Sequence, residues 1–191
     1  MVPGCYHPHM SDDHAAPLAF LGRLDQQLSA RCVVDPATSV RRGKIMTVVR
    51  RVSQSGSYGV GWVALFAVVV TLLEGWFVAL VAAACVLGTL MLNTVVKEII
   101  RRPRPASRAF DDHPTTFSMP SAHTSMAVVG ASIMTMVAPA WALLWWGWTT
   151  VLAVSRIVLG MHYVGDVVAG AAFGAALATW VVPHVMRAAG V

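Results

Sequence analysis

The stretch from Thr124 to Val154 carries no charged side chain. As one continuous helix it would be about 46 Å long at ~1.5 Å per residue, whereas the hydrocarbon core of a bilayer is ~30 Å thick. We therefore predict that it crosses a membrane twice and turns at Ala138-Pro139, because proline ends a helix. The chain is 57% hydrophobic and 12% charged, while soluble domains carry about 25% charged residues. This composition predicts an all-α, polytopic membrane protein.

Further apolar runs raise the expected number of transmembrane helices to about five, packed as one helical bundle. In the last run, Gly170 and Gly174 have the small-xxx-small spacing that lets two helices approach closely. We predict a single transmembrane domain over residues 55–191. Its other apolar runs are Tyr58–Leu73, Trp76–Val96 and Val164–Val182.

The N-terminal part differs in character from the apolar runs. Residues 1–16 are polar and have no apolar core, so we expect a disordered tail and no signal peptide. Residues 17–54 are expected to form one or two amphipathic helices that lie in the membrane interface. Leu18–Val34 has leucines at helical spacing among polar side chains, and Thr38–Val52 has Lys and Arg around apolar residues.

The charges and the cysteines narrow the possible ligands. The arginines cluster beside apolar runs, so the net charge of +5 favours membrane lipid headgroups or a phosphorylated substrate over nucleic acid. The cysteines are scattered, which predicts neither a disulfide framework nor a zinc site. The carboxylates near the arginines lack ligand spacing, so no metal and no cofactor are expected. The oligomeric state stays open.

A polar segment from Ser155 to Asp166 lies between two apolar runs. His162 and Asp166 are four residues apart, so on a helix the carboxylate could fix the tautomer of the imidazole. An oriented histidine is a nucleophile or a general base. Taken alone, this segment fits equally well with a polar helix end that contains a satisfied histidine.

Two other polar segments fall on the same face of the membrane when the crossings are counted. One holds Lys97 and Arg104-Pro105, and the other is Pro120-Ser121-Ala122-His123. Cationic side chains, a serine hydroxyl and backbone N–H groups can together cradle the oxygens of a phosphoryl group. We therefore expect metal-free chemistry in which His162 attacks phosphorus and His123 protonates the leaving oxygen.

These three motifs resemble the signature of the type 2 phosphatidic acid phosphatase (PAP2) family of acid and lipid phosphatases, which is related to the vanadium haloperoxidases. They read Lys97-(six)-Arg104-Pro105, Pro120-Ser121-Ala122-His123 and Ser155-Arg156-(five)-His162-(three)-Asp166. The resemblance implies a helical membrane fold, a phosphohistidine on His162, His123 as the acid and Asp166 orienting His162. It also implies that Lys97, Arg104, Ser121 and Arg156 bind phosphate, together with the amide of Ala122.

The sequence departs from the family pattern at two places. Ala122 stands where the family usually has glycine, although its amide can still contact phosphate. The first span of six-span relatives corresponds here to amphipathic sequence, which we expect to lie on the membrane surface.

The arginine distribution predicts the membrane side of the site. Lys and Arg outnumber acidic residues on the face that holds the site, so the positive-inside rule places it on the cytoplasmic face of the plasma membrane. A site at the headgroup level favours a lipid phosphate as substrate. The candidates are a polyprenyl-linked phosphosugar such as decaprenylphosphoryl-5-phosphoribose, phosphatidic acid, phosphatidylglycerophosphate and a polyprenyl diphosphate such as undecaprenyl diphosphate. Rival interpretations are a catalytically silent scaffold, an anion transporter and, more weakly, a haloperoxidase.

Overall fold

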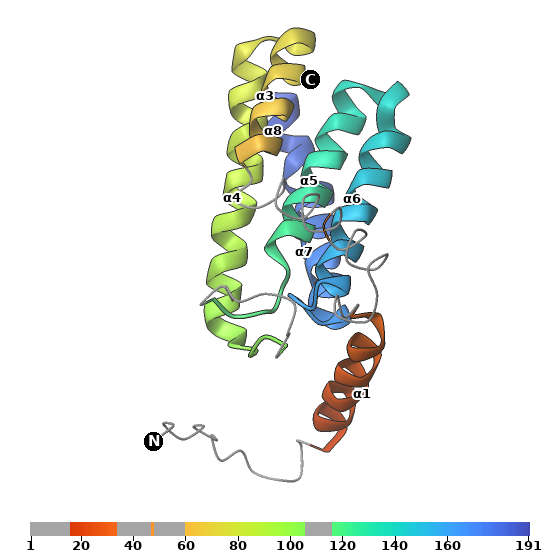
Figure 1. The fold of residues 1–191 in the computed structure, drawn as a ribbon. Helices are drawn as coiled ribbons and strands as arrows, with labels where there is room; N and C mark the ends of the chain where they lie inside the picture. Colours follow the sequence, from red (N-terminus) through yellow and green to blue (C-terminus); the bar gives the residue numbers. More distant parts are fainter. Residues whose placement is uncertain (1–15, 34–46, 48–59, 106–115) are drawn as a thin grey trace.

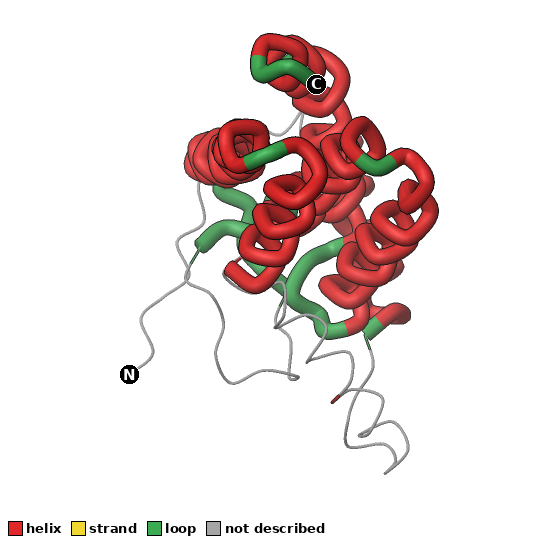
Figure 2. Tube along the Cα trace, turned by 90° about the horizontal axis from the view of Figure 1, so that it is seen from above, coloured by secondary structure: helices red, strands yellow, loops and turns green. Residues whose placement is uncertain are grey.

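The structure, a computed structural model, describes residues 16–33, 47, 60–105 and 116–191. These residues form helices and loops, and they contain no strand (Figure 2). The predicted all-α class is therefore confirmed for the described residues. The helices are α1 (Ala16–Cys32), α3 (Val60–Glu74), α4 (Trp76–Ile100), α5 (Ala122–Val137), the short 3-10 helix η2 (Pro139–Trp141), α6 (Ala142–Val158), α7 (Val164–Trp180) and α8 (Val182–Ala188).

Helices α3 to α8 run roughly along one direction and form the bundle, and α1 lies beyond one of its ends (Figure 1). We call this end, which holds the end of α4 and the start of α7, the site end. The α5–α6 connection lies at the opposite end. There α5 ends at Val137 and Pro139 opens η2, so the predicted turn at Ala138-Pro139 is confirmed.

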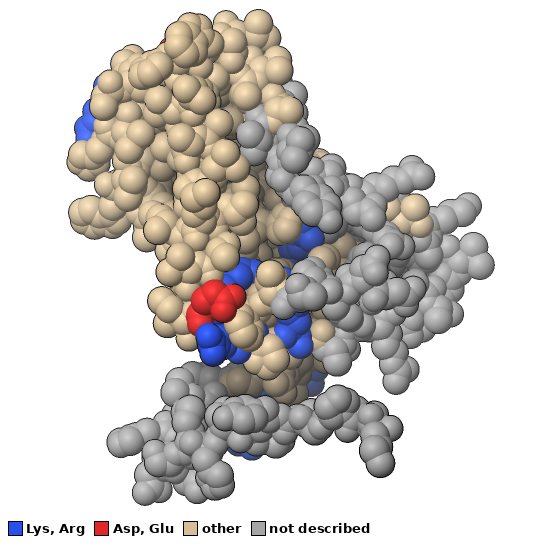
Figure 3. Space-filling view, turned by 90° about the vertical axis from the view of Figure 1, so that its left-hand side faces the viewer, with Lys and Arg blue, Asp and Glu red and all other residues tan. Residues whose placement is uncertain are grey.

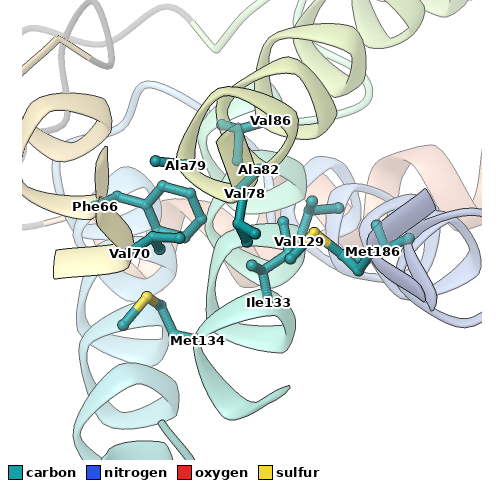
Figure 4. Close-up of a cluster of buried hydrophobic side chains, with 11 residues drawn as sticks. Phe66, Val70, Val78, Ala79, Ala82, Val86, Val129, Ile133, Met134 and Met186 are labelled. Carbon is teal, nitrogen blue, oxygen red and sulfur yellow. The ribbon is translucent and has the colours of Figure 1, made fainter. Parts of the chain in front are cut away.

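The apolar core fills the half of the bundle away from the site end. It joins α3, α4, α5 and α8, and Val70, Val129 and Ile133 are fully shielded from solvent (Figure 4). Within a membrane, close packing of such side chains stabilises helix association through van der Waals contact, because lipid tails are as apolar as the side chains themselves. The other half of the bundle is therefore free to hold polar groups.

Helices α5 and α7 approach each other closely in that second half. A Cβ atom added at Gly170 would lie 2.6 Å from the carbonyl oxygen of Ser121, and one at Gly174 would lie 2.6 Å from that of Ser125. Because the neighbouring atoms are backbone, they cannot move aside as a flexible side chain could. The close helix contact predicted from the glycine spacing is confirmed.

Much of the outer surface of the bundle is apolar. Large exposed hydrophobic side chains include Leu72, Met91, Ile99, Leu143 and Trp180. Figure 3 shows that Lys, Arg, Asp and Glu on one face gather mainly toward the site end, while most of the remaining surface is of other types. A surface of this kind suits lipid rather than water.

Two helical segments are long and apolar enough to cross a membrane, Trp76–Ile100 and Val164–Ala188. Helices α3, α5 and α6 have 15, 16 and 17 residues, slightly fewer than the ~20 that span a bilayer core without tilt or flanking residues. Five crossings stay a prediction.

The N-terminal region is described in part. Helix α1 occupies the segment Leu18–Val34 in which an amphipathic helix was predicted. Its placement in the membrane interface stays a prediction. The expected tail over 1–16 lies almost wholly outside the described residues, and so does the second interfacial segment, Thr38–Val52, apart from Thr47.

Candidate active site

The eight residues singled out in the sequence all lie at the site end of the bundle. Lys97 is in the last turn of α4, and Arg104 lies in the segment that follows it. Ser121 precedes α5, whose first turn holds Ala122 and His123, and Arg156 is in the last turn of α6. His162 lies between α6 and α7, and Asp166 is in the first turn of α7.

The segment after α4 turns sharply toward the site. Arg101 adopts a left-handed conformation with φ 51°, and its N–H donates to the carbonyl oxygen of Lys97 at 2.9 Å. Pro103 and Pro105 then prevent the helix from resuming, as their spacing in the sequence predicts. The turn directs Arg104 back over the bundle end.

His162 and Asp166 form a buried pair. The Nδ1 atom of His162 lies 3.5 Å from Oδ2 of Asp166, and the exposed fractions of the two side chains are 3% and 0%. A carboxylate facing Nδ1 favours the tautomer with its proton on that atom, which leaves a lone pair on Nε2. Arg104 approaches this second nitrogen, with Nη1 at 3.4 Å from Nε2. The imidazole therefore presents Nε2 toward a cation.

Burial lowers the pKa of His162 to about 4. The positive charges of Arg104 and Lys97 act in the same direction, while the facing carboxylate of Asp166 opposes it. At neutral pH the imidazole is consequently uncharged. An uncharged, oriented imidazole with a lone pair on Nε2 can act as a nucleophile.

Three cationic side chains lie at the site end around this histidine. Lys97 donates from Nζ to the carbonyl oxygen of Phe117 at 3.0 Å. Arg104 donates from Nε to the carbonyl oxygen of Thr116 at 2.7 Å and from Nη1 to that of Met161 at 3.0 Å. Arg156 is buried, with 1% of its surface exposed. Lys97 is also buried and Arg104 is half-buried. Cations shielded in this way favour an anionic ligand such as phosphate.

Ser121 joins the start of α5 to the start of α7. Its N–H donates to the carbonyl oxygen of Asp166 at 2.9 Å, and its hydroxyl accepts a hydrogen bond from Thr124 at 3.1 Å. The N-terminus of α5 begins one residue later, at Ala122, and a helix N-terminus carries partial positive charge. His123 is half-buried in the same turn.

Two residues of the site end were not identified from the sequence as part of the site. Arg102 donates from Nη1 to Oδ1 of Asp166 at 2.8 Å, and from Nη2 to Oδ2 of Asp25 in α1 at 2.8 Å. The sequence interpretation placed Arg102 among the headgroup cations and Asp25 among the polar residues of an interfacial helix. No local pattern indicates a contact across 77 residues of chain.

The described residues contain no group of three His, Cys, Asp or Glu side chains arranged to hold a metal ion. The donors that do converge are nitrogen-based cations, hydroxyls and backbone amides. This donor set is complementary to an oxyanion.

An all-helical bundle with an apolar exterior and a buried histidine–aspartate pair among cations defines a membrane protein equipped to handle phosphoryl groups. The family model of the PAP2 superfamily matches residues 74–189, and the chain belongs to this superfamily. The family resemblance of the three sequence motifs is thus confirmed.

Several relatives are similar over most of their length. The decaprenylphosphoryl-5-phosphoribose phosphatase of Mycobacterium tuberculosis (strain CDC 1551 / Oshkosh) is 30% identical over 153 residues, which cover 71% of this chain and 78% of the relative. The protein of the same name from Mycolicibacterium smegmatis is 34% identical over 153 residues, covering 72% and 77%.

One solved structure is similar in fold. It is the crystal structure of the first transmembrane PAP2 type phosphatidylglycerolphosphate phosphatase from Bacillus subtilis, with a TM-score of 0.71 and 23% sequence identity. The match covers 91% of this chain and 90% of that chain. At this identity the similarity shows that the two proteins share a helical fold.

Proposed function

We propose that this chain, a PAP2-family phosphatase, hydrolyses a lipid phosphate monoester or diphosphate through a phosphohistidine and without a metal ion. One observation carries the proposal: a buried His162–Asp166 pair presents Nε2 of the imidazole beside Arg104, at the bundle end that also holds Lys97 and Arg156. The family membership and the names of the relatives support the phosphatase class.

The proposed reaction has two displacements at phosphorus. In the first, Nε2 of His162 forms a bond to phosphorus while the bond from phosphorus to the lipid oxygen breaks, and His123 gives that oxygen a proton. In the second, His123 takes a proton from water, the water oxygen bonds to phosphorus and the P–N bond breaks. The products are a lipid alcohol, or a lipid monophosphate from a diphosphate, and inorganic phosphate.

The remaining site residues hold the phosphoryl oxygens in this proposal. The side chains of Lys97, Arg104 and Arg156 supply positive charge, and Ser121 and the amide of Ala122 supply hydrogen bonds at the positive end of α5. Charge that develops on the oxygens in the transition state is stabilised by donors that are already in place.

A lipid rather than a freely soluble phosphate is the proposed substrate class, because the bundle surface is apolar and the site lies at one end of it. The names of the relatives favour a polyprenyl-linked phosphosugar such as decaprenylphosphoryl-5-phosphoribose. Phosphatidic acid, phosphatidylglycerophosphate and undecaprenyl diphosphate are the alternatives. A catalytically silent scaffold is the rival from another class.

The test is release of inorganic phosphate by the detergent-purified protein from each of these four lipids, with and without EDTA. We expect release from at least one lipid at a rate that EDTA leaves unchanged. Loss of release in EDTA that added Mg²⁺ restores would contradict the metal-independent mechanism. Absence of release from all four lipids would favour the scaffold.

We also propose that five helices cross the plasma membrane and that the site faces the cytoplasm. Arg23 and Arg31 of α1 and the arginines after α4 gather at the site end, whereas Glu74 lies at the end of α3, at the opposite end of the bundle. Cytoplasmic segments carry an excess of Lys and Arg.

This orientation predicts a labelling pattern in a cysteine-free background. Glu98→Cys, at the site end, is expected to react with a membrane-impermeant maleimide only after the cells are permeabilised. Glu74→Cys, the matched exposed carboxylate at the other end, is expected to react in intact cells. The reverse pattern would contradict a cytoplasmic site.

A further inference from the structure

Arg102 lies between two carboxylates that come from distant parts of the chain. Its Nη1 donates to Oδ1 of Asp166 and its Nη2 to Oδ2 of Asp25, both at 2.8 Å. The guanidinium also lies over the ring of Tyr163, 4.2 Å from the centroid. A guanidinium fork held on both sides and stacked on a ring has a fixed orientation. Arg102 is therefore restrained by α1 as well as by the site.

Asp25 has a second partner at the start of α7. Its Oδ1 accepts a hydrogen bond from the N–H of Gly165 at 2.9 Å, and Ser29, one turn further along α1, accepts one from the N–H of Val164 at 2.9 Å. The first N–H groups of a helix have no acceptor within the helix, and a carboxylate there is stabilising. Helix α1 thus supplies the cap for α7, the helix that carries Asp166.

Gly165 leaves room for the carboxylate of Asp25. A Cβ atom at this position would lie 2.5 Å from Oδ2 of Asp25 and 3.3 Å from Nη1 of Arg102. Any larger residue would displace the carboxylate of Asp25. Glycine at 165 therefore leaves room for the Asp25 contact, which a larger side chain would disturb.

The catalytic carboxylate depends on the same network. Asp166 is fully buried, and its Oδ2 is shared between the N–H of Tyr163, at 2.9 Å, and Nδ1 of His162, at 3.5 Å. Its Oδ1 is held by Arg102. Because the contact to His162 is the longest of the three, the other two fix the position of the carboxylate. Movement of Arg102 would change the angle at which Asp166 faces the imidazole.

We propose that Asp25 of α1 is a positioning residue for catalysis, which orients Arg102 so that Arg102 holds Asp166 against His162. The inference rests on the proposed phosphohistidine function. It makes the N-terminal helix a component of the active site, although α1 contributes none of the residues assigned to phosphate binding or proton transfer.

A double-mutant cycle tests the proposal on full-length protein in detergent. Wild type, Asp25→Asn, Arg102→Gln and the double variant are compared for kcat and KM with the lipid of the panel that wild type hydrolyses fastest. We expect Asp25→Asn to lower kcat about 10-fold and Arg102→Gln about 100-fold, as outer partners of catalytic groups do. KM should change by less than about 2-fold, since neither residue is assigned to phosphate binding.

Non-additivity separates positioning from a general loss of stability. In the Arg102→Gln background, Asp25→Asn should cause less than about a 2-fold further loss, because residues that act through one another do not add. Asp25→Glu, which keeps the charge, should recover part of the activity. Gly165→Ala, which keeps both charges but displaces the carboxylate, should resemble Asp25→Asn.

The pH profile of kcat/KM gives a second measurement, because a substitution that only weakens the fold would leave the acid limb unchanged. The charged groups around the pair are Arg102, Arg104 and Lys97, and Tyr163 is the remaining titratable neighbour. Arg102→Gln leaves the Asp166 carboxylate less neutralised, so it should favour the imidazolium and move the acid limb of kcat/KM to higher pH.

The matched control is Glu98→Gln, which removes one exposed carboxylate near the same bundle end and should keep wild-type kinetics. Equal activity of Asp25→Asn and Glu98→Gln would overturn the positioning role of Asp25. Additive losses in the double variant, with an acid limb that does not move, would do the same. Either result would leave the proposed phosphatase function standing. A wild-type protein that releases no phosphate would overturn the proposed function and this inference with it.

Discussion

Replacing His162 with alanine is expected to lower kcat for phosphate release by about 10⁶-fold, as for other catalytic nucleophiles. The physical reason is that the buried Nε2 is the atom proposed to bond to phosphorus, and alanine leaves no nucleophile beside Arg104. The measurement is phosphate release from the best lipid of the panel, at enzyme concentrations high enough to detect residual turnover.

The matched control for this variant is His184→Ala. His184 is exposed in α8, in the half of the bundle away from the site end, so its removal should leave the rate unchanged. Equal activity of His162→Ala and wild type would contradict the nucleophile assignment. Loss of activity in both variants would indicate that the substitutions damage the fold, so both are also compared by thermal unfolding.

Asp166→Asn is expected to lower kcat by about 10⁴-fold while the volume of the side chain is kept, by analogy with the loss of an orienting carboxylate elsewhere. The amide can present its NH₂ group to Nδ1 of His162, which favours the tautomer that carries its proton on Nε2. That tautomer has no lone pair directed at phosphorus. Substrate binding should weaken much less, because the buried cations remain.

The pH dependence of this variant has a definite sign. In wild type, kcat/KM requires the uncharged imidazole, so it should fall as the pH decreases through the pKa of His162, which is about 4. The facing carboxylate of Asp166 raises that pKa. Removing the charge in Asp166→Asn should therefore move the acid limb to still lower pH. A limb that moves upward would contradict the assigned environment of His162.

The parts of the fold predicted from the sequence are those set by local pattern. The turn between α5 and α6 follows from a charge-free stretch too long for one crossing and from the proline at 139. The close contact of α5 with α7 follows from the spacing of Gly170 and Gly174. In both cases the determining residues are neighbours in sequence, so the physical constraint can be read without knowing the rest of the chain.

The candidate site was predicted in the same way. Its eight residues come from three short motifs, and counting crossings was enough to place the motifs on one face. The hydrogen bonds that set their geometry were not predicted. Lys97 and Arg104 donate to the carbonyl oxygens of Phe117 and Thr116, which any residue type could provide.

The contact between Asp25 and Arg102 could not be predicted from the sequence. Arg102 lies in an arginine-rich segment and Asp25 in an amphipathic helix, and each pattern has a simpler explanation at the membrane surface. Their contact joins positions 77 residues apart and has no local signal. The steric requirement for glycine at 165 is likewise visible only in the structure, once α1 is in place.

The central claim is that the phosphoryl group is carried on His162, and direct trapping of the intermediate tests it best. Wild type is mixed with a lipid that carries ³²P in the phosphate released by the reaction. The mixture is then quenched rapidly in alkali, in which a P–N bond survives. We predict label on the peptide that contains His162, acid-labile, present in His184→Ala and absent in His162→Ala. Label on a different residue, or full turnover of wild type with no labelled protein at any quench time, would contradict the claim.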